Sequence, residues 1–335
     1  MNMSVSRREF LRQSFAFSAL ASLGSLPSLA KQHPSTIGTS NLLMIGDWGY
    51  ENIAAQSTVA AAMQRYAHDH SLKTDALLML GDNWYGPLSG GVNSPRWSTQ
   101  FEDMYPKSVF DCPAYAVLRN HDYQRMPESK VEAELAYAKN GETRWTLPSR
   151  WYRFEFPATK PLATFLALDS NVFRVLSTAS KRENYTLTPE EQAEQLQWLK
   201  TELEKPRTTP YLIVMALHPI YSNGPHGDHK VLIADWEPLL REHKAHLYLA
   251  GHDHDMQHLE FEGHPTSFFL SGGGGAGLYP VATDPAKRGP MAVSVHGFSH
   301  LEAKKEWMTL RHVDASGNII HAFRKYKDGS VTILT

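Results

Sequence analysis

The stretch Ala76-Leu77-Leu78-Met79-Leu80-Gly81-Asp82-Asn83-Trp84-Tyr85 decides the fold of this 335-residue chain. Its apolar first half predicts a buried strand, and the glycine after it predicts a turn that presents the Asp82 carboxylate. Four other segments set metal-binding side chains beside a glycine or a turn, and most of them also follow an apolar run: Gly46-Asp47-Trp48-Gly49, Asn120-His121-Asp122, His218-Pro219 and Gly251-His252-Asp253-His254. We therefore expect all five segments to meet at one edge of a buried sheet.

The rest of the chain alternates between strand-like and helix-like patterns. Strands are expected at residues 41–45, 76–80, 113–118, 151–156, 163–168, 211–217 and 246–249, and the pattern after Phe268 is more strand-like. Helices are expected at residues 53–68, 128–139 and 188–203, with a loop and a short helix at 87–106. This alternation predicts an α/β core. Because there is no internal repeat and no long Pro/Gly linker, we expect one domain over residues 31–335.

The first thirty residues have the pattern of a twin-arginine signal peptide. Ser6-Arg7-Arg8-Glu9-Phe10-Leu11-Arg12 precedes an apolar stretch from Phe15 to about Leu26, and Ser28-Leu29-Ala30 offers a cleavage site. An uncleaved anchor is the alternative, but the stretch is shorter than the ~20 residues of a spanning helix. We expect the twin-arginine export machinery to deliver a periplasmic or secreted protein with no stable membrane anchor after cleavage.

The net charge and the cysteine content bear on the expected partners and on where the protein folds. The formal charge is -2, and loss of residues 1–30 removes three Arg and one Glu, which lowers it to -4. Such a chain has no polyelectrolyte character, so nucleic acid is not an expected partner. Cys112 is the lone cysteine and cannot form an intrachain disulfide, which suits a protein folded in the cytoplasm before export.

The residue types in the five segments suit two metal ions. The two oxygens of the Asp82 carboxylate can bridge two ions, and Tyr85 as a phenolate suits a hard trivalent ion such as Fe³⁺. Asn120 supplies a neutral amide oxygen. On an extended segment, His252 and His254 would face one way while Asp253 points elsewhere. The plainer interpretations are Asx-turn residues for the aspartates, a rim aromatic for Tyr85 and a packing histidine for His218, but together the segments favour a dimetal site.

The order of these motifs resembles the calcineurin-like metallophosphoesterases, and within them the small tartrate-resistant purple acid phosphatases. The likeness runs from about residue 41 to 325 and includes further matches: Arg144-Trp145, Pro148-Ser149, Trp151-Tyr152-Arg153, Leu166-Ala167-Leu168-Asp169, Gln197-Trp198-Leu199-Lys200 and Asp314-Ala315-Ser316-Gly317. Tyr85 separates this group from metallophosphoesterases that lack a tyrosinate. One departure is Arg119, which stands where the family has glycine, and its cation would either strain the turn or reach towards the phosphate.

The resemblance implies a fold, a set of ligands and a reaction. The fold is a four-layer metallophosphoesterase fold, a two-sheet β-sandwich flanked by helices, with the metals at the strand ends. Fe³⁺ would be held by Asp47, Asp82, Tyr85 and His254. A divalent ion (Fe²⁺, Zn²⁺ or Mn²⁺) would be held by Asp82, Asn120, His218 and His252, with Asp82 bridging. His121 and His226 match the substrate-contacting histidines, although His226 could instead be an ordinary exposed loop residue.

We expect an acid phosphatase that hydrolyses phosphate monoesters of small phosphorylated substrates by a metal-bound hydroxide at a dinuclear Fe(III)–M(II) centre. His121 and His226 would stabilise the developing charge. Two alternatives remain: a phosphodiesterase or nucleotide pyrophosphatase on the same site, and a non-catalytic exported phosphate- or metal-binding protein.

Two sequence features near the site have open interpretations. Trp48 and Trp84 either form an apolar rim that favours aromatic leaving groups or pack beneath the site. The run Ser271-Gly272-Gly273-Gly274-Gly275 lacks the Gly-Lys-Ser/Thr of a nucleotide-binding loop, so we expect a tight turn beside the metals.

Overall fold

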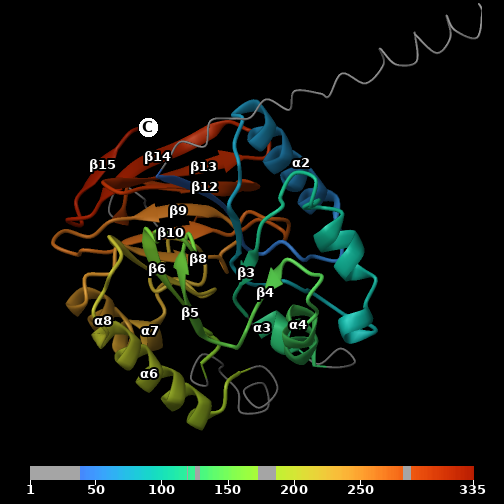
Figure 1. Cartoon of the computed structure of the whole chain (residues 1–335), viewed down its shortest axis with the longest axis horizontal. Helices are drawn as coiled ribbons and strands as arrows, with labels where there is room; N and C mark the ends of the chain where they lie inside the picture. The colour runs from blue at the N-terminus through green and yellow to red at the C-terminus, as the bar shows by residue number, and fades with distance from the viewer. Residues whose placement is uncertain (1–37, 119, 125–128, 173–185, 282–287) are drawn as a thin grey trace, which may run out of the picture. The chain divides into compact units, whose positions relative to one another are not determined.

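Two β-sheets carry the fold in the computed structural model, which describes residues 38–118, 120–124, 129–172, 186–281 and 288–335. The first sheet (sheet A) has the order β15-β14-β13-β12-β1-β2-β3-β4 (Figure 1). Its parallel half contains β1 (Thr39–Ile45), β2 (Ala76–Met79), β3 (Ala114–Ala116) and β4 (Trp145–Thr146). Its antiparallel half contains β12 (Gly297–Lys304), β13 (Trp307–Asp314), β14 (Ile319–Tyr326) and β15 (Val331–Ile333).

The second sheet (sheet B) has the order β11-β9-β10-β8-β7-β6-β5. Its central strands are parallel: β6 (Ala163–Ala167), β7 (Tyr211–Met215), β8 (Leu247–Ala250) and β10 (Ser267–Ser271). Three antiparallel strands flank them: β5 (Tyr152–Phe156), β9 (Met256–Leu259) and β11 (Met291–Val293). Parallel strands deliver their carboxyl ends to one edge of a sheet, so both sheets have an edge at which loops can carry a site.

Helices of different lengths pack around the two sheets. The longer ones are α2 (Ala54–Asp69), α4 (Lys130–Ala138) and α6 (Pro189–Glu204). The shorter ones are η1 (Gly91–Asn93), η2 (Trp97–Glu102), α3 (Asn120–Tyr123), α7 (Lys230–Asp235) and α8 (Glu237–Glu242). The expected start of α6 is confirmed by a capping box, in which Thr188 and Glu191 each satisfy a backbone N–H of the other. In the part of the chain described, no helix combines the length and apolar character needed to cross a bilayer.

The side chains of β6 show how the layers are built. Phe165 and Ala167 belong to a buried cluster that includes α2 and residues of both sheets. The alternate residues Leu166 and Leu168 belong to a second cluster, with Leu199 of α6. Successive side chains of a strand point to opposite faces, so sheet B lies between sheet A and the helices α6, α7 and α8 (Figure 1). The expected four-layer α/β fold is confirmed.

Some expectations concern residues that the structure does not describe, and some elements of the structure were not expected. The signal peptide (residues 1–30), the lead-in as far as residue 37 and Arg119 lie outside the described residues. Gly38–Thr335 forms one compact unit. The helices α7 and α8 and the strand β9 were not expected from the sequence.

Candidate metal centre

The loops after β1, β2 and β8 carry the predicted ligands in an unusual backbone conformation. Asp47, Asp82 and His252 have φ values of 59°, 51° and 74°, in the left-handed region that side chains other than glycine rarely adopt. Backbone bonds join the first two loops, from Asp47 N to Gly81 O (3.0 Å) and from Gly49 N to Asp82 O (3.2 Å). Such strain persists where surrounding contacts enforce it, and it is concentrated here on candidate ligands.

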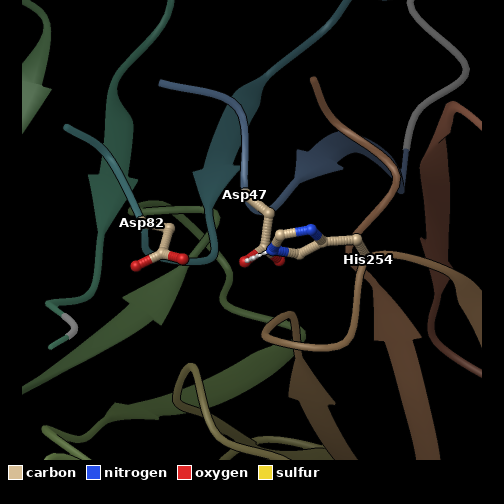
Figure 2. A group of neighbouring side chains, drawn as sticks. All are labelled: Asp47, Asp82 and His254. Carbon is tan, nitrogen blue, oxygen red and sulfur yellow. Dashed lines mark ion pairs between the residues drawn. The ribbon is translucent and has the colours of Figure 1, made fainter. Parts of the chain in front are cut away.

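Four predicted ligands of the trivalent ion lie together. The Tyr85 Oη atom lies 3.2 Å from Asp47 Oδ1 and 3.0 Å from His254 Nε2, and it donates a short hydrogen bond to Asp82 Oδ2. Ligand atoms of Asp47, Asp82 and His254 all lie within 4.8 Å of one another (Figure 2). All four side chains are buried.

The predicted ligands of the divalent ion occupy neighbouring strand ends. The His218 ring lies 4.5 Å from the His252 ring, centroid to centroid. Ser170 Oγ lies 2.9 Å from His218 Nδ1, so Nε2 is the nitrogen that the prediction requires as the ligand atom. Asn120 follows β3, which lies next to β2, and its Oδ1 is buried without a hydrogen-bond partner among the described residues.

This donor set fits metal ions on physical grounds. Asp47 and Asp82 are fully buried, and both lie within hydrogen-bond distance of the Tyr85 phenol oxygen. Burial is the larger cause, and the Asp47 charge the next, that raises the pKa of Tyr85 well above its ordinary value. Buried carboxylates need a compensating cation, and hard oxygen donors with imidazoles suit an iron ion or a divalent first-row metal. The orphaned Asn120 carbonyl is also the kind of oxygen that a metal satisfies.

Both predicted substrate histidines lie at this cluster. The half-buried His121 ring lies 4.3 Å from the Tyr85 ring, centroid to centroid. The His226 side chain is 44% exposed, yet its ring stacks on that of His252 at 4.2 Å, and its Nδ1 bonds the buried Asp253 carboxylate. His226 is therefore held against the His252 ring, and its role towards a substrate stays a prediction.

Two expectations about local structure are corrected. The His252–His254 segment is a turn and not an extended strand, because the Asp47 carboxylate accepts a hydrogen bond from His252 N (2.7 Å). Its two imidazoles face different partners, Tyr85 for His254 and His218 for His252. The rim interpretation of Trp48 and Trp84 is wrong: both are fully buried and pack edge to face at 5.4 Å.

The glycine-rich run after β10 is the expected turn beside the site. A Cβ added at Gly272 would lie 1.9 Å from Asp253 O, and one added at Gly274 would lie 2.3 Å from Gly46 O. Only glycine permits this approach of backbone to backbone. The run therefore packs the β10 end against the loops of Asp47 and Asp253.

Sequence reasoning missed a buried polar group beneath the loop 81–86. Lys130 Nζ on α4 donates to Trp84 O (2.7 Å) and Gly86 O (2.9 Å), while Asp122 Oδ1 accepts from Trp84 N (3.0 Å). Glu134, one turn along α4, accepts from Asn83 Nδ2 (2.9 Å). Burial, and next the Asp122 charge, raises the pKa of Glu134 well above its ordinary value.

A second missed residue holds the same loop from its other side. Arg96 Nη1 donates to Tyr85 O and Pro87 O, each at 2.7 Å, and Nη2 donates to Gly49 O at 2.9 Å. Tyr279 was also missed, and its ring stacks on that of His254 at 4.1 Å. Nothing in the local sequence marked these residues, because each acts on a loop distant along the chain.

Comparisons with known proteins show which proteins this chain is similar to. The calcineurin-like phosphoesterase family matches residues 40–256. Tartrate-resistant acid phosphatase type 5 of Homo sapiens is 30% identical over 324 residues, which cover 89% of this chain and 94% of that protein. Purple acid phosphatase 7 of Arabidopsis thaliana is 30% identical over 322 residues, which cover 93% of each. Among solved structures, GAP50, the anchor in the inner membrane complex of Plasmodium, shares the fold with a TM-score of 0.68 and 22% identity, over 85% of this chain and 88% of that chain.

Proposed function

Because the chain belongs to the calcineurin-like phosphoesterases and, within them, to the purple acid phosphatases, we propose that it hydrolyses phosphate monoesters at a dinuclear Fe(III)–M(II) centre. The observation that carries the proposal is the meeting of Asp47, Asp82, Tyr85 and His254 around one phenol oxygen. A phenol oxygen that lies among two buried carboxylates and an imidazole provides a donor set that suits a trivalent ion.

The proposed ligands form two sets that share Asp82. Asp47, Asp82, Tyr85 and His254 would hold Fe³⁺, and Asp82, Asn120, His218 and His252 would hold Fe²⁺, Zn²⁺ or Mn²⁺. When bound, the two ions would supply Lewis-acid chemistry, lowering the pKa of a water molecule and neutralising phosphate oxygens. Ser170 Oγ would accept the Nδ1–H of His218 and so hold its Nε2 ready for the metal.

Two histidines would act on the substrate. His121 lies over the Tyr85 ring, on the short helix that also carries Asn120. His226 is held by Asp253 at Nδ1, which leaves Nε2 to face phosphate or to protonate the leaving alkoxide. Asp253 accepts from Ser222 Oγ as well, so the carboxylate that positions His226 is itself fixed.

The test combines metal analysis with a visible spectrum of the purified mature protein. We expect about one iron and one divalent ion per chain and a tyrosinate charge-transfer band that Tyr85→Phe removes. Tyr50→Phe is the matched control, because the exposed Tyr50 ring packs 5.5 Å from that of Tyr85, outside the ligand cluster. An active enzyme without colour would overturn the iron assignment and leave the phosphoesterase standing.

Rates on 4-nitrophenyl phosphate and bis(4-nitrophenyl) phosphate separate the proposed monoesterase from a phosphodiesterase or nucleotide pyrophosphatase. A higher kcat/KM for the diester would favour that rival. Absence of turnover on both compounds, with the metals bound, would favour a non-catalytic binding protein. If the monoesterase proposal is right, Asp82→Ala abolishes hydrolysis, because Asp82 belongs to both ligand sets.

We also propose export of the folded protein through the twin-arginine machinery to the periplasm. The support is the Arg7-Arg8 motif with its apolar stretch. Changing both arginines to lysine in the full chain should leave the uncleaved precursor in the cytoplasm, as cell fractionation would show. Equal periplasmic yield from both forms would refute this route.

A further inference from the structure

A cavity of about 340 Å³ opens beside the second set of candidate ligands. Its lining includes the histidines His218, His252 and His226, together with Lys230 and Val231. Its volume lies within the range of small-molecule sites, roughly 300–1,000 Å³. Since His218 and His252 line it, the cavity offers room for the alcohol part of a phosphate ester bound at these histidines.

Lys230 supplies a positive charge to the lining of the cavity. Asp228 also lines the cavity, but it is paired with Arg288 (2.6 Å) and accepts a hydrogen bond from Ser222 N (3.2 Å). Lys230 is exposed, has no ion pair among the described residues, and has no acidic side chain beside it in the first turn of α7. The Asp228 charge is therefore compensated, and the Lys230 charge is available to a ligand.

The position of Lys230 is not explained by the stability of α7. The helix starts with His229, whose Nδ1 accepts from Leu232 N (3.2 Å), so the capping bond does not involve the Lys230 side chain. A cation in the first turn of a helix also opposes the helix dipole. Substitution of Lys230 should therefore leave the helix intact.

We propose that this cavity is the leaving-group subsite, and that Lys230 selects monoesters whose alcohol carries a second anionic group, either a carboxylate or another phosphate. The inference rests on the proposed phosphatase function and adds its substrate class. A single exposed ion pair is weak because solvent screens it, so the preference due to Lys230 should be a few-fold. The pairing should weaken as salt screens it.

The test compares kcat/KM on phenyl phosphate, 4-carboxyphenyl phosphate and 1,4-phenylene bisphosphate. Lys230→Gln should lower kcat/KM about threefold to fivefold on the charged substrates and leave phenyl phosphate unchanged. Lys230→Glu should lower it further. Lys200→Gln, on the exposed face of α6, is the matched control. A loss on only one charged substrate identifies whether the carboxylate or the phosphate is the second group.

A binding measurement tests the proposed subsite without any turnover of substrate. Calorimetric titration of the metal-loaded protein with phenylphosphonate and 4-carboxyphenylphosphonate should show a preference for the charged ligand that Lys230→Gln removes and that 0.5 M salt reduces. If wild type and Lys230→Gln both hydrolyse phenyl phosphate and show the same preference for the charged substrates, the proposed subsite is wrong. The proposed phosphatase function would then still stand. Absence of all monoester hydrolysis would instead refute the proposed function.

Discussion

Replacing Lys130 with methionine tests whether α4 holds the loop that carries Asp82 and Tyr85. Lys130 is 1% exposed, and its ammonium group donates to Trp84 O at 2.7 Å and to Gly86 O at 2.9 Å. Methionine keeps much of the volume but removes both donors. The carbonyls that flank Tyr85 would then lose their charged partner.

The size of the effect follows from two opposing contributions. A hydrogen bond from a charged donor contributes about 1.5–3 kcal/mol, so two contribute roughly 3–6 kcal/mol. Burial opposes this, because it lowers the pKa of Lys130 to about 8 and so penalises the charged form. We therefore expect a loss near the lower end of that range, about 3 kcal/mol in the free energy of unfolding.

The assay is urea unfolding of the metal-free protein, so that metal binding does not add to the measured stability. Lys139→Met at the exposed C-terminal end of α4 is the control and should change the free energy by no more than about 0.5 kcal/mol. In the metal-loaded protein, Lys130→Met should also release metal to a chelator faster. A loss below about 1 kcal/mol with unchanged metal release would mean that the other contacts, including those of Arg96 and Asp122, suffice to hold the loop, and our reasoning about Lys130 would be wrong.

Three further predictions address the site and the core. Asp253→Asn should lower kcat on alkyl phosphates about 10-fold to 100-fold. The same substitution should lower kcat by much less when His226 is already alanine. If the two effects are fully additive in this double-mutant cycle, Asp253 does not position His226. Gly49→Ala should reduce the folded yield, because the new Cβ would lie 1.7 Å from Asn83 O, whereas Gly141→Ala meets nothing within 4 Å; equal melting temperatures would contradict this. Burial lowers the pKa of His300 to about 3, so the folded state lacks a proton that the unfolded state gains, and stability falls as pH drops from about 6.5 towards 3. His300→Gln should flatten that pH dependence in chemical unfolding, and an unchanged slope would refute it.

The candidate ligands could be predicted because their signal is local. An apolar run followed by Gly-Asp predicts a strand that ends in a turn, and parallel strands bring such ends to one edge. β1 and β2 end just before Asp47 and Asp82. The structure brings these aspartates together with Tyr85 and His254, although their roles as ligands remain a prediction.

The residues that support the ligands could not be predicted, because their environment is set by distant parts of the chain. A lysine and a glutamate four apart on a helix usually form an exposed pair. Here Lys130 and Glu134 are buried, since the loop 81–86 offers carbonyls and the Asn83 amide at that point. The short helices α7 and α8 were missed for a related reason: six residues give too little periodicity to separate a helix from a polar loop.

The turn at His252 shows why local reasoning fails at the site itself. No glycine occupies this position, so propensity favours an extended or helical backbone. The hydrogen bond from His252 N to Asp47 Oδ2 and the φ of 74° show that a loop more than two hundred residues away sets the conformation. The same loop is bonded to Gly81 and Asp82. Protein contacts thus tie together the segments that carry the candidate ligands, so a metal ion would meet a largely formed cage and would spend little of its binding free energy on ordering the chain. A site of this kind is compatible with the proposed twin-arginine export, which would carry a protein already folded and loaded with metal.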